Sequence, residues 1–190
     1  MIAEITGVIK RKSPHFLIIE TGGVGFKVFV TENIAQSVSE KNPVTLFTHL
    51  AVRENSLDLY GFTSIENIEF FEQLLSVSGI GPKSALTILN TAPVEVLRRG
   101  ILLGDTSHLS KVSGIGRKSA EKIVLGLKDK VGKTHHTKLE LRNEIDTIEA
   151  LTALGYRERD AREALVKVPA EITDTGEKVK KALKILGAGI

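Results

Sequence analysis

Apolar and polar residues alternate with a period of two along much of residues 1–62. The short runs are separated by polar or glycine-rich turns, and this pattern is typical of half-buried β-strands. The runs lie near residues 5–9, 16–19, 26–30, 44–52 and 57–62, with a helical connection near 31–38. Five short strands with one helical connection predict a small barrel.

The aromatic residues of this segment allow two interpretations. They could stack on nucleic-acid bases, as in some small barrels. Their positions within alternating apolar runs favour packing in the barrel core instead. These residues are Phe16, Phe26, Phe29, Phe47, Tyr60 and Phe62.

From residue 63 the spacing of apolar residues becomes helical. Thr63 and Glu66 form a candidate capping box at the start of the first helix. Breaks near residues 91–93 and 104–106 divide the helices, and a long helix is predicted over about 117–131. The apolar stripe of the first helix consists of Ile65, Ile68, Phe71, Leu74 and Leu75.

The C-terminal part predicts a linker and three short helices. Residues 132–142 lack a clear period, and residues 159–168 and 177–186 form the second and third helices. A small bundle on a tether favours a protein-docking module, and a packed appendage without a partner is the alternative. The first helix ends at Gly155, and its stripe consists of Ile145, Ile148, Leu151 and Leu154.

One nine-residue phrase occurs twice in the helical part. Residues 77–85 read Val-Ser-Gly-Ile-Gly-Pro-Lys-Ser-Ala, and residues 112–120 differ only in having Arg117 where the first copy has Pro82. The glycines permit a tight hairpin, and the free amides at the following helix start, beside a lysine, favour a phosphate. The isoleucine between the glycines predicts a tip that packs against something or rests at a shallow surface. Candidate DNA contacts are Gly79, Ile80, Gly81, Lys83, Ser84, Gly114, Ile115, Gly116, Arg117, Lys118 and Ser119.

Nucleotide-binding motifs do not fit this phrase. A P-loop requires a glycine directly before the lysine, and the dinucleotide fingerprint requires a third glycine where Ser84 and Ser119 stand. The phrase resembles the helix-hairpin-helix motif, which grips the DNA backbone without reading bases. The alternative is a glycine turn that only joins two packed helices, and two near-identical copies weigh against it. Two similar units sharing one core would place their hairpins side by side on a DNA groove.

Charge supports a polyanionic partner. The net charge is only +3, but residues 98–142 contain eleven basic and four acidic residues, a net charge of +7 around the second hairpin. A solvated helical face is the alternative interpretation. The chain has no cysteine, and His135 and His136 lack nearby ligands, so we expect neither a metal nor a cofactor.

The first residues of the sequence contain neither a basic segment nor a long apolar run. No stretch approaches the roughly 20 apolar residues of a membrane span. We therefore expect no signal peptide, no membrane partner and a cytoplasmic location.

The order of these parts gives the chain a family resemblance. A strand-rich start ending in Leu-Tyr-Gly-Phe, two helix-hairpin-helix copies, a linker and a bundle containing Ala-Leu-Gly-Tyr resemble the RuvA family of bacterial junction-binding subunits. The predicted fold is α+β and multidomain. Its parts are a five-stranded OB-like barrel (1–63), an all-α double helix-hairpin-helix domain (64–131), a linker (132–142) and a three-helix UBA-like bundle (143–190).

The resemblance implies partners that the residues alone do not indicate. RuvA-like proteins bind four-way (Holliday) junctions as a homotetramer, or as two tetramers, an octamer, around one junction. Their C-terminal bundle, here residues 143–190, recruits the hexameric ATPase RuvB, which drives branch migration in recombination and repair. The resolvase RuvC cuts the junction. ATP chemistry then belongs to RuvB, in agreement with the missing P-loop.

The family also carries an acidic pin of two adjacent carboxylates before Leu-Tyr-Gly-Phe. Here these positions are Glu54 and Asn55, so the second acid is missing. Carboxylates at a junction centre would repel phosphates and help part the strands. We expect a weaker pin than the two-acid form, and whether Asp58 compensates is left open.

Two other functions compete with a junction scaffold. Helix-hairpin-helix units also occur in nucleases and glycosylases, which would need clustered carboxylates or a lysine nucleophile near the hairpins. Glu69 and Glu72 could share a helix face, although the solvent side of the first helix is the simpler interpretation. A single-strand binder acting through the barrel is the third possibility.

Overall fold

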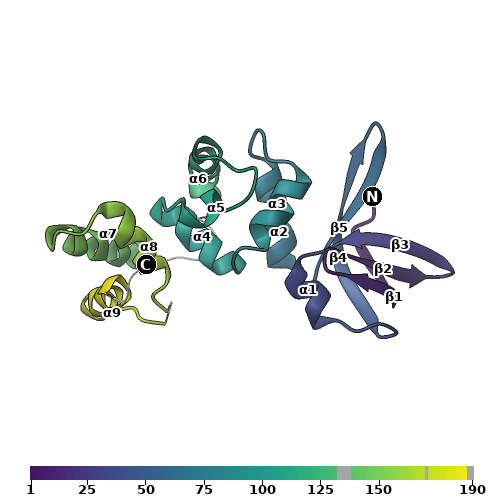
Figure 1. The fold of residues 1–190 in the computed structure, drawn as a ribbon, viewed down its shortest axis with the longest axis horizontal. Coiled ribbons are helices and arrows are strands. Elements are labelled where there is room, and N and C mark those ends of the chain that lie inside the picture. Colours follow the sequence, from purple (N-terminus) through teal and green to yellow (C-terminus); the bar gives the residue numbers. More distant parts are fainter. Residues whose placement is uncertain (132–137, 170, 188–190) are drawn as a thin grey trace. The chain divides into compact units, whose positions relative to one another are not determined.

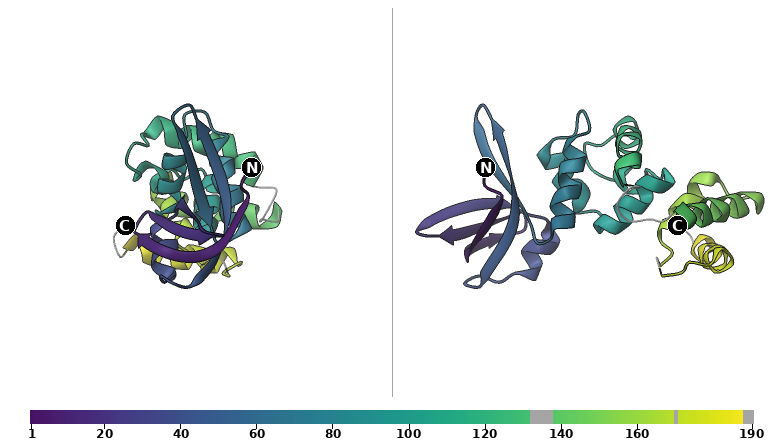
Figure 2. Two further views of the ribbon diagram at one scale, coloured as in Figure 1. Left: turned by 90° about the vertical axis from the view of Figure 1, so that its right-hand side faces the viewer. Right: turned by 180° about the vertical axis from the view of Figure 1, so that it is seen from behind.

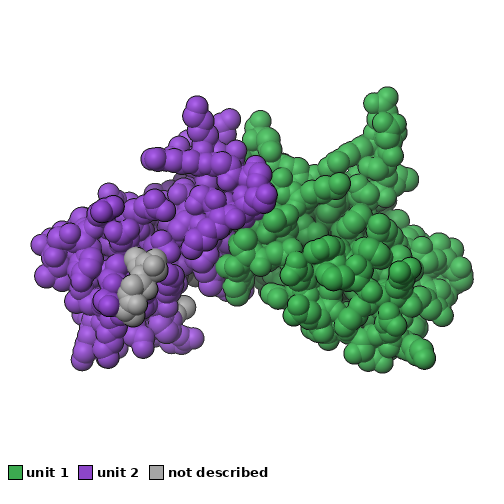
Figure 3. Space-filling view, viewed as in Figure 1, with its two compact units in different colours: residues 1–94 green, residues 95–190 purple. Residues whose placement is uncertain are grey.

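The computed structural model describes residues 1–131, 138–169 and 171–187. The chain separates into two compact units, residues 1–94 and 95–190 (Figure 3). This division falls inside the predicted helix-hairpin-helix domain of residues 64–131. The first hairpin therefore belongs to the same unit as the barrel, and the second hairpin to the same unit as the C-terminal helices.

Unit 1 begins with a closed five-stranded barrel, as the alternating pattern predicted (Figure 1). The strand order around the barrel is β1-β2-β3-β5-β4, and every neighbouring pair is antiparallel except β3 with β5. The elements are β1 (Glu4–Ser13), β2 (Phe16–Thr21), β3 (Val24–Phe29), α1 (Glu32–Ser37), β4 (Pro43–Arg53) and β5 (Ser56–Phe62).

Aromatic packing attaches the first helix after the barrel to the barrel itself. Tyr60 and Phe62 are fully buried, which confirms core packing for these two aromatics. The Phe71 ring lies 5.4 Å from the Tyr60 ring and 4.9 Å from the Phe62 ring, measured between centroids. The other four barrel aromatics, Phe16, Phe26, Phe29 and Phe47, are half-buried. Helix α2 is thus held against β5 by three stacked or tilted rings.

Helices α2 (Ile65–Leu75) and α3 (Pro82–Leu89) complete unit 1. The predicted capping box is wrong by one residue, because the hydroxyl of Ser64 accepts the hydrogen bond from the Asn67 amide at 3.3 Å. The buried face of α2 consists of Phe70, Phe71 and Leu74, whereas Ile65 is exposed. The buried face therefore keeps Phe71 and Leu74 of the expected stripe, adds Phe70 and leaves Ile65 in solvent.

Unit 2 is entirely helical in its described residues. The three C-terminal helices predicted from the sequence are confirmed, but α7 begins at Lys138, inside the segment predicted as a linker. The rest of that linker, residues 132–137 with the two adjacent histidines, lies outside the described residues. The helices are α4 (Val94–Leu103), α5 (Ser107–Ser110), α6 (Arg117–Val131), α7 (Lys138–Ala153), α8 (Glu158–Val166) and α9 (Thr175–Gly187).

The buried face of α7 differs from the predicted stripe. Ile148 and Leu151 are buried as expected, but Ile145 is 53% and Leu154 is 60% exposed. Glu144 is buried instead, because its carboxylate is paired with Arg99 of α4. Helices α7, α8 and α9 pack against one another (Figure 2). The predicted helix end is confirmed, since Gly155 follows α7 with φ +93°.

Candidate nucleic-acid interface

The first hairpin, residues 76–81, joins α2 to α3 through a tight turn. Gly79 has φ +90°, a left-handed conformation that side-chain-bearing residues rarely adopt. A Cβ added at this glycine would meet nothing within 4 Å. Backbone conformation, and not lack of space, therefore requires the glycine, and a ligand can approach the backbone here.

The second hairpin has the same geometry. Gly114 has φ +83°, and a Cβ at this position would also meet nothing within 4 Å. In the first hairpin the Ile80 amide donates to the Val77 carbonyl at 3.0 Å, and in the second the Ile115 amide donates to the Val112 carbonyl at 3.0 Å. The repeated sequence thus folds into a repeated turn.

The isoleucines of the two hairpins hold the turns together. Ile80 is 8% and Ile115 is 4% exposed, and their amides are used within the turns. Of the two placements expected for these tips, the structure selects inward packing. These side chains support the turns and do not offer a surface to a ligand, so any contribution to DNA contact is through the conformation that they stabilise.

The first residues of α3 and α6, which follow the two hairpins, carry backbone amides that are free to donate hydrogen bonds. In the described chain no acceptor faces the amides of Gly81, Lys83 and Ser84 at the start of α3. At the start of α6 the same is true of Gly116, Arg117 and Lys118. The second site differs by one donor, because the Ser119 amide is already bonded to the Gly116 carbonyl at 3.0 Å.

The charged side chains at these helix starts point to anion binding. Lys83 and Lys118 are exposed, and neither forms an ion pair with another described residue. Ser84 and Ser119 are half-buried. Free amides with an unpaired lysine beside them match the needs of a phosphate group. The arrangement fits a sugar-phosphate backbone without base readout.

Arg117 adds a guanidinium to the second site. Its side chain is 89% exposed, and its Nε lies 2.9 Å from Oε1 of Glu121, one turn further along α6. Such an exposed pair is weak, so the cation remains available to a stronger anionic partner. The first site has Pro82 at the same position, which supplies neither an amide proton nor a charge.

The first site receives its guanidinium from the barrel, which was not predicted from the sequence. Nη2 of Arg53, the last residue of β4, lies 3.9 Å from the position that a Cβ on Gly81 would occupy. Arg53 is exposed, and the tip of its strand pair and the α2–α3 hairpin extend to the same side of unit 1 (Figure 1). In the sequence, the one feature that could have drawn attention to Arg53 is its position directly before Glu54.

Glu54 and Asn55 form the two-residue turn between β4 and β5. Both are exposed, so this turn, where the family resemblance predicts an acidic pin, is open to solvent. Asp58 lies two residues beyond Ser56 on β5, is half-buried, and accepts a hydrogen bond from the Ser56 hydroxyl at 3.1 Å. Asp58 therefore sits along the strand pair below the turn and does not join Glu54 at the tip.

The charged side chains of this strand pair also affect the pKa of Tyr60, a buried residue of β5. Burial raises the pKa of Tyr60, and the nearby Asp58 carboxylate raises it further, whereas Arg53 lowers it. Tyr60 is therefore neutral at physiological pH. Arg53 pairs with Ser56, two residues before Asp58 and four before Tyr60, so strand alternation puts all three side chains on one face of the strand pair. The contact between the Tyr60 and Phe71 rings shows that this face is the one toward α2.

The carboxylates considered for a metal-dependent nuclease do not form a cluster in the described part of the chain. Among the described residues, no group of three or more His, Cys, Asp or Glu side chains is placed to hold a metal ion. Oε1 of Glu72 lies 3.0 Å from Nδ1 of His49, so this carboxylate ties α2 to β4. In the described part of the chain, no helix is long and apolar enough to cross a membrane.

Comparisons with known proteins cover almost the whole chain. Residues 1–61 match the family described as RuvA N terminal domain, residues 71–129 match the SAM-like helix-hairpin-helix tandem, and residues 145–187 match the RuvA C-terminal domain. A relative from Caldanaerobacter subterraneus, a "Holliday junction branch migration complex subunit RuvA", is 42% identical over 98% of this chain and 99% of its own. Relatives of the same name from Aromatoleum aromaticum and Delftia acidovorans are 36% and 39% identical, each over 98% of this chain and 98% and 99% of their own.

Proposed function

This chain belongs to the RuvA family, and on that premise we propose that it is the junction-binding subunit of a Holliday-junction branch-migration complex. The observation that carries the proposal is the twin glycine turn. Each copy offers free amides, an unpaired lysine and a guanidinium at the start of a helix. The chain is a non-catalytic subunit, and its contribution is to bind and shape DNA.

The chain binds DNA through the phosphates of its backbone. Each helix start presents main-chain donors to an anion, and Lys83 and Lys118 add charge without specifying a base. Binding of this kind releases counterions, so affinity falls steeply as salt rises. Selectivity for a crossing of four arms must then come from the arrangement of several hairpins, which we assign to a homotetramer, or to two tetramers on one junction.

The pin would act at the centre of that assembly. Glu54 is an exposed carboxylate at the end of a strand pair, and a fourfold assembly would gather four copies of it. Like charges repel, so phosphates are kept away from that point and the arms are held open. Asn55 contributes no charge, and Asp58 lies further down the strand, so the barrier is weaker than one built from two acids per chain.

The energy for branch migration would come from the hexameric motor RuvB, recruited through residues 143–190, with RuvC cutting the junction afterwards. Two exposed apolar side chains of α7, Ile145 and Leu154, support a docking role for this bundle. Replacing either by Asp should lower the stimulation of the motor ATPase and leave junction binding unchanged. We place the complex in the bacterial cytoplasm.

A binding titration tests the main proposal. We expect a four-way junction to be bound far more tightly than linear duplex of equal length, with a steep loss of affinity between about 50 and 200 mM salt. The double variant Lys83→Gln with Lys118→Gln should lose junction affinity at every salt concentration. Equal affinity for junction and duplex would remove the junction claim, and preference for single strands would favour the barrel as the binding surface.

A further inference from the structure

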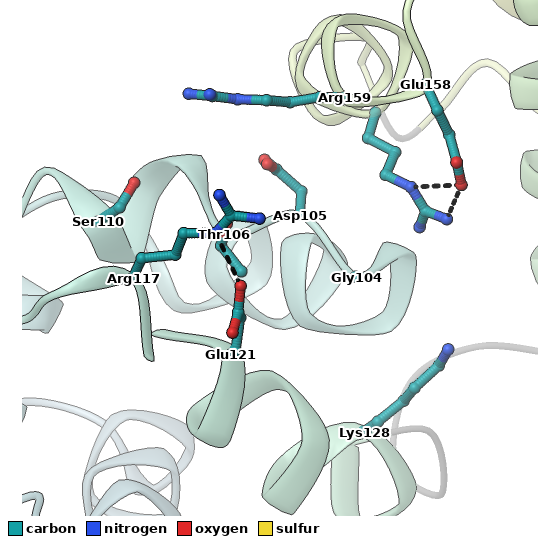
Figure 4. Close-up of a pocket in the computed structure, with 10 residues that line it drawn as sticks. Gly104, Asp105, Thr106, Ser110, Arg117, Glu121, Lys128, Glu158 and Arg159 are labelled. Carbon is teal, nitrogen blue, oxygen red and sulfur yellow. Dashed lines mark hydrogen bonds and ion pairs between the residues drawn. The ribbon is translucent and has the colours of Figure 1, made fainter. Parts of the chain in front are cut away.

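Unit 2 contains a polar cleft beside the second hairpin (Figure 4). Its volume is about 700 Å³, and it is lined by the loop after α4, by α6 and by the start of α8. Arg117 of the hairpin is one of the lining residues. The cleft is therefore continuous with the candidate phosphate site at the start of α6.

Buried contacts fix the bundle that forms the far wall of the cleft. Arg99 of α4 lies with its Nε 2.8 Å from Oε1 of Glu144, and both side chains are almost fully buried. The same carboxylate lies 3.8 Å from Nζ of Lys178, and Arg99 also donates to the carbonyl of Val168. Leu103 joins the apolar core of the bundle. This network joins α4 to α7 and α9 through charged side chains that are buried within unit 2.

A glycine is among the residues that line the cleft. Gly104 has φ +72°, and Nη1 of Arg162 lies 3.0 Å from the position of a Cβ added there. A side chain at residue 104 would push Arg162 away from this position. The guanidinium of Arg162, from α8, thus lies against the backbone of the loop after α4.

Ion pairs within the cleft leave two cations without a partner. Glu121 is paired with Arg117, Glu158 is paired with Arg162, and both carboxylate oxygens of Asp105 accept hydrogen bonds from Ser107. Within the described residues, Arg159 of α8 and Lys128 of α6 form no ion pair. Both are exposed and line the cleft from opposite walls (Figure 4). The bonds from Ser107 do not neutralise Asp105, so the four cations and three carboxylates that line the cleft give it a net charge of +1.

We propose that this cleft binds backbone phosphates of the DNA arm that the second hairpin holds, with Arg159 and Lys128 as the contacting cations. The inference rests on the proposed junction-binding function. It assigns DNA contacts to the C-terminal bundle as well as to the hairpins. A DNA strand is favoured over an acidic protein segment because Arg117 lies on both the cleft and the hairpin site, so one continuous polyanion can satisfy both.

The test compares two double variants with the same change of charge in the full-length chain. Arg159→Gln with Lys128→Gln removes the cleft cations, and Lys181→Gln with Lys184→Gln removes two exposed lysines of α9. For the cleft variant we expect junction affinity to fall about tenfold near 0.1 M salt, and the salt slope to decrease by about 2, one for each phosphate that is no longer neutralised. The α9 variant should change the slope little. All four side chains are exposed, so thermal unfolding should be unaltered.

The outcomes separate this inference from the function on which it rests. If both variants bind the junction equally well, the cleft does not contact DNA and the inference is overturned. If the cleft variant keeps its junction affinity but no longer stimulates the motor ATPase, the cleft is instead a docking site for an acidic protein segment. If the wild-type chain shows no preference for junctions, the proposed function fails, but the effect of the cleft variant on duplex affinity still decides whether the cleft binds DNA.

Discussion

The two hairpins have nearly the same sequence and the same backbone turn, but they are supported and charged differently. The first is held on the barrel by the rings of Tyr60, Phe62 and Phe71, whereas the second belongs to the unit that also contains the C-terminal bundle. The first has Pro82 where the second has Arg117. A repeated motif therefore does not imply a repeated environment.

The source of the guanidinium shows the difference most clearly. Arg53 reaches Gly81 from a strand that is distant in the sequence, whereas a Cβ on Gly116 would meet nothing within 4 Å. The second site carries its own arginine, which Glu121 holds in an exposed ion pair. Each site thus combines free amides, a lysine and a guanidinium, although only the second encodes all of them locally.

The largest expected difference between the units concerns stability. Glu144→Ala would leave Arg99 and Lys178 buried without their carboxylate, and such a loss costs about 3–5 kcal/mol. Urea denaturation should show this loss, and hydrogen exchange should place the lost protection in unit 2 and not in the barrel. The control is Glu158→Ala, whose pair with Arg162 lies at the surface, where solvent screens it, so the free energy of unfolding should change far less. Equal effects of the two variants would contradict the role assigned to the buried network.

The next largest effect tests whether the turns are equivalent. Gly79→Ala and Gly114→Ala each force a side chain into a left-handed conformation, at a cost of about 1–2 kcal/mol. We expect both to lower stability by similar amounts and to weaken junction binding. Gly116→Ala is the matched control, because its φ is not in the left-handed region and its Cβ would be free of contacts. This control should keep full stability, so any loss of binding by it would report close approach of DNA to the backbone.

A smaller effect compares the two guanidinium groups. Arg53→Gln and Arg117→Gln should each reduce the slope of log affinity against log salt by about 1, with an affinity loss of several-fold. Because one residue belongs to the barrel and the other to α6, similar losses would support equivalent phosphate sites. An unchanged slope for Arg53→Gln would show that the first hairpin works without the barrel arginine. Lys27→Gln, an exposed barrel cation that lies over the Phe16 ring, is a suitable control.

The smallest expected effect has the opposite sign. Glu121→Gln removes the carboxylate paired with Arg117, so the guanidinium is no longer shared when DNA arrives. Since exposed pairs are weak, we expect junction affinity to rise only about two- to threefold. The same change cannot help the first hairpin, where Pro82 replaces the arginine. A decrease in affinity would indicate that Glu121 orients Arg117 for binding and does not compete with DNA for it.

Much of the fold could be predicted from local patterns. The alternation in residues 1–62 predicted the five strands, and the glycine phrase predicted both turns, because backbone conformation at Gly79 and Gly114 depends on short-range sterics. The stripes on helices were less reliable. Burial of Glu144 and exposure of Ile145 follow from the position of Arg99, and no periodicity in α7 contains that information.

The sequence by itself determined the repeated turn, the helix starts with their lysines and the single acid, Glu54, of the turn between β4 and β5. Only the tertiary structure decided which unit supports each hairpin, that Arg53 completes the first site and that Arg159 and Lys128 face a common cleft. The physical reason is the distance along the sequence between the residues that interact. Turns and helix starts are set by neighbours a few residues apart, whereas charge complementarity and aromatic packing join residues that the chain brings together only on folding.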